Sequence, residues 1–272
     1  MLTIHQDETI VIETDSSRPT LAVAFHPDGK HVSCGNMEGV RLYRVADGLE
    51  VGDQIMMGTQ VLLNAISVST DGRWIVYGTT RGASVWGVQT QQKTVEVQDT
   101  NPVPTVDISP DSTKFATGTG SDASIWDILT GERSVGPLKH VGGVVGVKFS
   151  PNGDRFATAG RDSIHVFDSR NGNQLEAITV KPGISFWPRS TPLAWSNDGQ
   201  QVFVLSMDYK IKSFKVSTGY KMAEARFRRT KMSGTVSMAL AANGKFLATT
   251  AGKSLIFWDA STLKDWPSHR GH

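Results

Sequence analysis

The chain has 272 residues, of which 39% are hydrophobic, and its formal net charge is +2. This charge gives no overall field that would attract nucleic acid or an anionic membrane. The single cysteine, Cys34, excludes a disulfide framework and a cysteine-based zinc site, and it suits a reducing compartment. The first residues alternate like a strand and carry acids, unlike a secretory signal, and no apolar run is long enough to span a membrane. We therefore expect a cytoplasmic or nuclear protein that makes no membrane contact.

Taken from the N-terminus, the sequence repeats one pattern six times. A tight turn recurs at Asp28, Asp71, Asp111, Asn152, Asp198 and Asn243, with spacings of 43, 40, 41, 46 and 45 residues. On both sides of each turn, apolar residues alternate with a period of two, which is typical of half-buried strands. The spacing is close to the roughly 40–45 residues of a four-stranded propeller blade.

Two sets of equivalent positions keep their register through all six units. The first strand of each unit carries an apolar pair, namely Val23/Phe25, Ile66/Val68, Val106/Ile108, Val147/Phe149, Leu193/Trp195 and Met238/Leu240. The third strand ends on an aromatic residue, namely Tyr43, Trp86, Trp126, Phe167, Phe214 and Trp258. Because only 8% of the chain is aromatic, this column indicates a shared structural role.

The fourth unit, from His140 to Arg170, contains the pattern most fully and closes on Phe167-Asp168. This stretch resembles a WD-repeat unit, and the chain as a whole is similar to the degenerate WD-repeat proteins of fungi. The resemblance implies that His140 is the structural histidine of the repeat, with Thr158 and Asp162 as possible hydrogen-bond partners. The same resemblance gives a structural role to Trp86, Trp126, Phe167 and Trp258. Since the other units lack the histidine, we expect stability to rest mainly on apolar packing.

The physics of an isolated blade favours a ring. One four-stranded sheet cannot bury both of its faces, but several sheets packed radially bury each other. We therefore expect an all-β, six-bladed β-propeller that forms a single domain, with repeats at about 20–60, 61–100, 101–140, 141–186, 187–231 and 232–262. WD-repeat proteins close the ring with an N-terminal strand, so residues 8–14 should pair with the last blade, and residues 263–272 should form a tail.

No catalytic or cofactor-binding constellation is evident in the sequence. Gly118 to Ala123 imitates a dinucleotide fingerprint, but it leads into a strand, so a strand-to-strand turn explains it better. The histidines have no metal-ligand spacing, and no motif places a nucleophile near His140. We therefore predict a non-enzymatic protein without a cofactor or metal. An enzyme whose site is assembled from loops at the channel mouth stays a third alternative.

The longest link between units contains aromatic residues. Phe186, Trp187 and Arg189 lie between the fourth and fifth repeats, on the side that faces ligands in the family. These residue types dominate interface hot spots. The alternative is that the two aromatic residues pack against their own protein.

A basic run covers residues 205–231. It contains eight Lys or Arg residues, including Arg226, Arg228 and Arg229, against Asp208 and Glu224. Such a run could attract an acidic peptide, or it could be a solvated strand face. Only Phe227 lies within its most basic part, which argues against stacking on nucleic acid.

The segment from Phe167 to Arg170 also resembles the box with which some WD-repeat proteins dock onto the adaptor of a cullin-RING ubiquitin ligase. Asp168 and Arg170 would then contact the adaptor; otherwise Asp168 caps a turn and Arg170 is solvated. The leading hypothesis is a scaffold that displays binding loops to other proteins or peptides. A substrate receptor of a ubiquitin ligase is the alternative.

Overall fold

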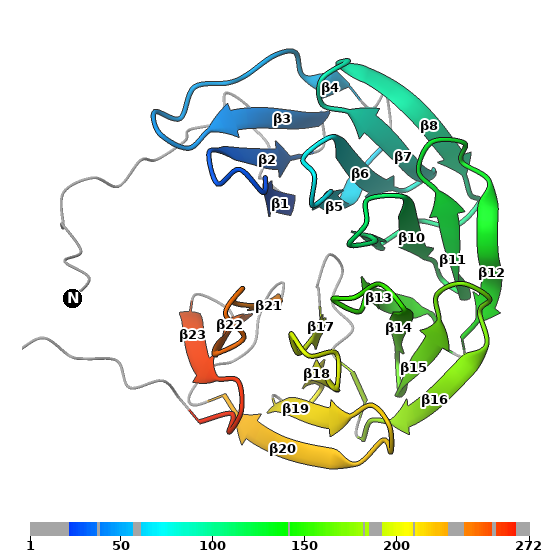
Figure 1. Cartoon of the computed structure of the whole chain (residues 1–272), viewed down its shortest axis with the longest axis vertical. Coiled ribbons are helices and arrows are strands. Elements are labelled where there is room, and N and C mark those ends of the chain that lie inside the picture. The colour runs from blue at the N-terminus through cyan, green and yellow to red at the C-terminus, as the bar shows by residue number, and fades with distance from the viewer. Residues whose placement is uncertain are drawn as a thin grey trace, which may run out of the picture.

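The strands of the chain form six separate antiparallel sheets arranged around one centre (Figure 1). The computed structural model describes residues 22–36, 39–56, 61–140, 142–181, 183–184, 192–208, 210–227, 237–251 and 254–264. In these residues lie 23 strands and no helix, so none forms a helix that could cross a membrane. The expected all-β, six-bladed propeller is confirmed. Residues 8–14, the expected closing strand, lie outside the described residues.

The first three blades have four strands each, which follow one another from the centre outward. They are β1 (Ala22–Phe25), β2 (His31–Gly35), β3 (Gly39–Arg44) and β4 (Ile55–Met56); β5 (Leu63–Val68), β6 (Trp74–Thr79), β7 (Gly82–Gly87) and β8 (Gln92–Gln98); and β9 (Thr105–Ile108), β10 (Lys114–Gly118), β11 (Asp122–Asp127) and β12 (Arg133–Lys139).

The last three blades follow the same order, and in the described residues the sixth has three strands. They are β13 (Val144–Phe149), β14 (Arg155–Gly160), β15 (Ser163–Asp168) and β16 (Gln174–Thr179); β17 (Leu193–Trp195), β18 (Gln201–Ser206), β19 (Lys210–Lys215) and β20 (Lys221–Arg226); and β21 (Met238–Leu240), β22 (Phe246–Ala251) and β23 (Ser254–Asp259).

A serine fixes the turn between the first two strands of four blades. The hydroxyl oxygens of Ser69, Ser109, Ser150 and Ser196 each accept a hydrogen bond from the backbone N–H five residues ahead, at 2.8–2.9 Å. The same hydroxyls donate to the turn side chains of Asp71, Asp111, Asn152 and Asp198 at 2.5–2.9 Å. These bonds satisfy polar groups that would otherwise compete with the strand ladder.

The core lies between blades. Five hydrophobic clusters are present in the described residues, and each joins two consecutive blades. Between the third and fourth blades, for example, Ile125 packs in one cluster with Val147, Phe149 and Phe167. Side chains along a strand alternate between the two faces of the sheet. The apolar pair of the first strand therefore faces the preceding blade, as does the aromatic residue at the end of the third strand. The residue just before that aromatic residue faces the next blade. This arrangement explains the two sequence columns.

Polar contacts also cross from blade to blade. Asp107 of the third blade accepts from Lys148 Nζ at 2.6 Å and from the backbone N–H of Phe149 at 2.9 Å. Trp195 Nε1 donates to the Lys148 carbonyl at 3.1 Å, which ties the fifth blade to the fourth. These bonds fix the axial register of neighbouring blades, whereas the apolar clusters supply most of the burial.

Candidate binding cleft and loop surfaces

The links between blades and the turns between the second and third strands share one side of the propeller, named the link face. The backbone N–H groups of Asp99 and Val103 donate to the Arg81 and Thr79 carbonyls at 3.1 and 2.8 Å. The same pattern recurs two blades later, where Val180 donates to the Asp162 carbonyl at 2.8 Å. Links and turns are therefore hydrogen-bonded into one surface.

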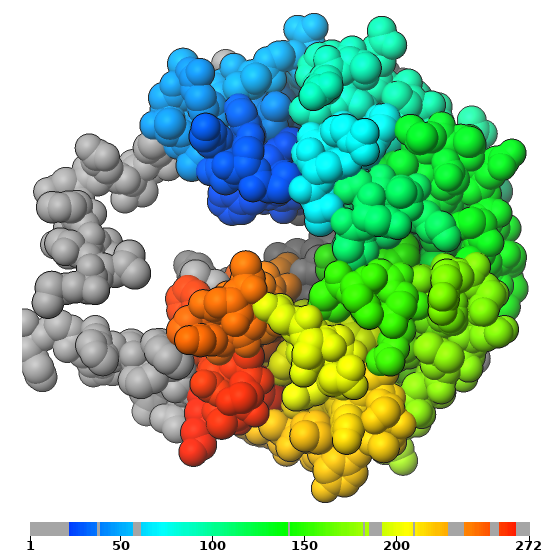
Figure 2. Space-filling view, in the orientation of Figure 1, coloured from blue at the N-terminus to red at the C-terminus, as the bar shows by residue number. Residues whose placement is uncertain are grey.

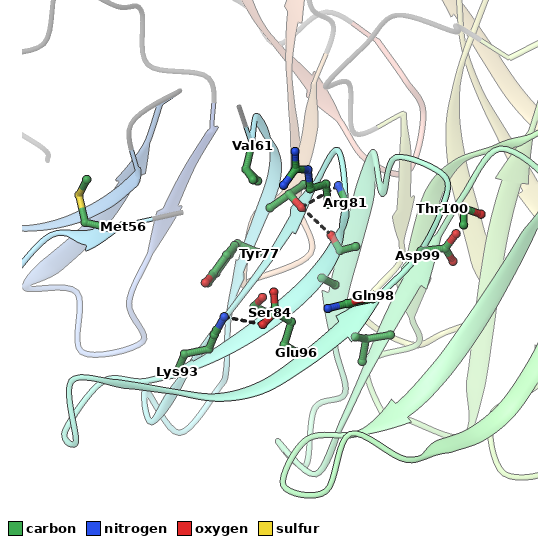
Figure 3. Close-up of a pocket in the computed structure, with 14 residues that line it drawn as sticks. Met56, Val61, Tyr77, Arg81, Ser84, Lys93, Glu96, Gln98, Asp99 and Thr100 are labelled. Atoms are coloured by element: carbon green, nitrogen blue, oxygen red, sulfur yellow. Dashed lines mark hydrogen bonds and ion pairs between the residues drawn. The ribbon is translucent and has the colours of Figure 1, made fainter. Parts of the chain in front are cut away.

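A cavity of about 550 Å³, named the cleft, opens between the first and second blades (Figure 3). It exists because β4, the outer strand of the first blade, has 2 residues, whereas the outer strands of the next four blades have 6 or 7. The short strand leaves part of the second blade uncovered. Three side chains in register across β6, β7 and β8 form its wall: Tyr77, Ser84 and Glu96.

The cleft is polar and holds both signs of charge. Lys93 Nζ donates to Glu96 at 2.6 Å, and this hydrogen bond raises the pKa of Lys93. Burial raises the pKa of the Tyr77 phenol, which stays neutral near pH 7. The exposed Arg81 lies at the mouth (Figure 3). These groups can orient a polar ligand by hydrogen bonds. The residues that line the cleft include no histidine that could activate a nucleophile.

Only part of the predicted partner surface falls on described residues. Phe186, Trp187, Arg189, Arg228 and Arg229 lie outside them. Arg226 is exposed at the end of β20, opposite Lys210 on β19. The proposed contact role of this set therefore stays a prediction.

Ion pairs inside the fifth blade offset much of the basic run. Glu224 accepts from Lys210 at 2.8 Å and from Lys221 at 2.7 Å, and these two bonds lower its pKa to about 2. Lys212 is buried, and its ammonium group donates to the Lys181 carbonyl at 2.5 Å and lies 3.3 Å from Asp208. The lysines are thus paired within the blade, and Lys212 is buried rather than on a solvated strand face.

Asp168 and Arg170 bind each other. Arg170 Nη2 lies 3.0 Å from the Asp168 carboxylate, and the Arg170 backbone N–H donates to the same group at 2.9 Å. The arginine hydrogen bond lowers the pKa of Asp168. This is the turn-capping arrangement, between β15 and β16, and it leaves the Arg170 side chain 76% exposed. Because strands alternate in direction, this turn lies on the side opposite the link face.

His140 of the fourth blade packs on a residue that was not among its two expected hydrogen-bond partners, Thr158 and Asp162. His140 stacks on His165 with ring centroids 4.2 Å apart. A Cβ at Gly160 would collide with the His140 ring, so this glycine makes the stack possible. The expected partner Thr158 is buried, and its hydroxyl has no hydrogen-bond partner.

The chemistry of the aromatic column explains why Thr158 is isolated. In the third and sixth blades the equivalent threonines accept from tryptophan: Trp126 Nε1 donates to Thr117 at 2.9 Å, and Trp258 Nε1 donates to Thr249 at 2.8 Å. Phe167 takes the tryptophan position in the fourth blade and has no N–H to donate. The expected tie through the Thr158 hydroxyl is therefore wrong. Trp126 and Trp258 are buried and hydrogen-bonded, and their structural role stays a prediction. Trp86 packs at the interface of the first and second blades.

The cleft is a feature that sequence patterns did not indicate. The cleft depends on the length of one outer strand. Outer strands carry the weakest apolar pattern, since several of their residues face solvent, so their lengths are hard to predict from the sequence. The described residues contain no group of three or more His, Cys, Asp or Glu side chains arranged to hold a metal ion.

Comparison with known proteins agrees with this architecture. Residues 133–168 match the family described as WD domain, G-beta repeat. The guanine nucleotide-binding protein subunits beta of Nicotiana tabacum and Solanum tuberosum are each 28% identical to this chain over 210 residues, covering 68% of this chain and 54% of the relative. The chain thus spans about half the length of these relatives.

A solved structure shows the same fold across nearly the whole chain. The β-propeller domain of Cps50 (Swd1) from Myceliophteria thermophila has a TM-score of 0.75 and 16% sequence identity, covering 96% of this chain and 90% of that one. Six radially packed blades, an aromatic residue at the end of each third strand and a matched repeat in the fourth blade lead to one conclusion. The chain folds as a six-bladed β-propeller, and residues 133–168 carry a WD repeat.

Proposed function

We propose that this propeller is a non-enzymatic scaffold that binds a segment of a partner protein in the cleft between its first and second blades. The observation that carries the proposal is the two-residue β4 beside a cleft lined by the row of Tyr77, Ser84 and Glu96, of which Tyr77 and Ser84 are buried and Glu96 is exposed. Loops on a rigid scaffold can contact partners without disturbing the fold. The beta-subunit relatives are named as subunits, which supports a role in assembly with other proteins.

The chemistry of the cleft suggests a polar segment as the ligand. Lys93 and Glu96 already pair with each other, so an incoming group must either join this pair or replace one member of it. Arg81 adds an exposed cation at the mouth. A segment that carries a carboxylate would be held by Arg81 and Lys93, and Gln98 and Thr100 could bond its backbone.

A charge reversal with a matched control tests the cleft. Lys93→Glu is compared with Lys139→Glu, because both lysines lie on outer strands and each pairs with one carboxylate, at 2.6 and 3.3 Å. Partner proteins that copurify with each variant are quantified by mass spectrometry. We expect Lys93→Glu to lose a defined subset that Lys139→Glu retains. Identical partner sets for the two variants would rule out the cleft.

The same assay distinguishes the other two surfaces. Phe186→Ala/Trp187→Ala tests the link between the fourth and fifth blades, and Arg226, Arg228 and Arg229 belong to the same predicted set of partner-binding residues. Arg170→Ala tests adaptor docking, which the exposure of the Arg170 side chain permits. Selective loss of a ligase adaptor in Arg170→Ala would favour the substrate-receptor function. Loss confined to Lys93→Glu or to the aromatic double variant would favour the scaffold.

A further inference from the structure

A cavity of about 260 Å³, named the notch, opens between the fifth and sixth blades, which lie side by side in Figure 2 in yellow to gold and in orange to red. Its walls include Asp198, Gln201 and Phe203 of the fifth blade and Leu240, Gly244 and Ala260 of the sixth. Asp198 and Gly244 belong to the turns between the first two strands of their blades, so the notch lies on the side opposite the link face. The notch is smaller than the roughly 300–1,000 Å³ of sites for drug-sized ligands, and it fits one long side chain.

The notch has an apolar floor and an acidic rim. Phe203 and Ala260 are buried, at 1% and 6% exposure, and Leu240 is partly buried beside them. Asp198 is exposed and lies at the rim. The residues that line the notch include no lysine or arginine. This combination fits a side chain that has an apolar stem and a cationic head.

The carboxylate of Asp198 is oriented and ionised. The Ser196 hydroxyl and the Gln200 backbone N–H donate to its Oδ1 at 2.5 and 3.0 Å. These bonds lower the pKa of Asp198, so the group carries its charge near pH 7. Within the described ranges, Asp198 forms no ion pair and its Oδ2 accepts no hydrogen bond. A cationic ligand therefore meets an acceptor oxygen that no neighbouring side chain already uses.

The interface between the fourth and fifth blades shows what can occupy the equivalent place. Arg155 and Gln201 are equivalent, because the backbone N–H of each donates to the hydroxyl of the serine five residues before it. Arg155 Nη1 reaches across the interface and donates to the Gly199 carbonyl of the fifth blade at 3.4 Å. At the notch, Gly244 has the position of Gly199, and the shorter, uncharged Gln201 has the position of the arginine. The notch thus lies where the preceding interface holds a guanidinium group.

A second difference between the two interfaces widens the notch. Val216 and Ala260 are equivalent, since the backbone N–H of each donates to the carbonyl of the residue after the turn glycine, at 2.9 and 3.0 Å. Alanine in place of valine removes two methyl groups from the wall. We propose that the notch binds an arginine side chain of a partner protein, with its aliphatic stem on Phe203 and Leu240 and its guanidinium group on Asp198. This inference goes beyond the cleft and does not depend on it.

Methyl NMR of the full chain, labelled at alanine and leucine, tests the proposal with a defined probe. The probe is a blocked pentapeptide of four alanines around one central arginine, and its control has citrulline, a neutral residue of the same shape, at the centre. We expect the arginine peptide, at millimolar concentration, to shift the Leu240 and Ala260 methyl signals until they saturate. The citrulline peptide should bind at least about fivefold more weakly, because it lacks the charge that Asp198 pairs with.

Three variants separate the notch from other surfaces. Asp198→Asn should weaken the arginine peptide about fivefold, whereas Asp111→Asn, in the equivalent turn of the third blade, should not. Gln201→Arg should abolish the shifts, because its own guanidinium group then occupies the notch as Arg155 does one blade earlier. Lys93→Glu should leave them unchanged, so failure of the cleft and failure of the notch are distinguishable. Absence of shifts at Leu240 and Ala260, or equal affinities for the two peptides, would overturn the proposal.

Discussion

A buried threonine at one position of the second strand has different partners in different blades. Thr117 and Thr249 accept hydrogen bonds from tryptophan, at 2.9 and 2.8 Å, but the Thr158 hydroxyl has no partner. All three residues are 1–3% exposed. In the fifth blade the equivalent position, opposite Lys212, is occupied by Val204. The aromatic residue of this blade is Phe214, and both Val204 and Phe214 are buried. Valine is thus already accepted where phenylalanine replaces tryptophan.

We therefore expect the threonine-to-valine substitution to change sign between blades. Thr117→Val or Thr249→Val leaves a buried indole N–H without an acceptor and should lower the free energy of unfolding by about 1–3 kcal/mol. Thr158→Val removes a buried hydroxyl that makes no bond, keeps the volume, and should raise the free energy of unfolding by about 1 kcal/mol.

Urea denaturation of the three variants and the wild type measures this difference. The midpoint should fall for Thr117→Val and Thr249→Val and rise for Thr158→Val, with the same slope in all four proteins, since the surface exposed on unfolding does not change. A fall for Thr158→Val as large as that for Thr117→Val would refute the assignment of hydrogen bonds.

Two further predictions concern pH and the contact between blades. Burial lowers the pKa of His26 and His165 below the ordinary value of 6.5, so the unfolded chain binds protons more readily than the folded chain. The contribution of these two residues to the free energy of unfolding is therefore complete above about pH 6.5 and is lost as the pH falls. The urea midpoint should drop between pH 7.5 and 5.5, and it should drop less in His165→Phe. An unchanged midpoint would contradict this reasoning. Asp107→Ala removes the acceptor of both Lys148 and the Phe149 N–H and should lower the free energy of unfolding by about 2 kcal/mol, whereas Asp47→Ala, in an exposed turn, should cost clearly less. Equal costs would indicate that Asp107 does not join the blades.

Features that every blade repeats could be predicted from the sequence. The aromatic column and the first-strand pairs were recognised because the same side must be buried six times, and burial does follow those columns from Val106 to Trp258. The hydrogen-bonded tie was less predictable, because Phe167 and Thr158 must be considered together to see that the threonine has no donor.

Features that depend on a missing or shortened neighbour could not be predicted in this way. Val23 and Phe25 have the same pattern as Val147 and Phe149, yet their exposures differ because no blade of the described residues packs on them. The cleft likewise results from the length of β4, not from any residue that lines it. A strand pattern indicates which face can be buried, but the pattern alone does not show whether a neighbour packs on that face.

The rate at which a thiol reagent labels two equivalent positions tests the difference between the first blade and the inner blades most directly. Phe25→Cys and Phe149→Cys are compared in a Cys34→Ser background, since they occupy the same place in the first and fourth blades. The structure predicts fast maleimide labelling at position 25, which is 69% exposed, and slow labelling at position 149, which is 6% exposed. Equal protection of both positions would contradict the account, because it would mean that the first and sixth blades are already covered in the isolated chain.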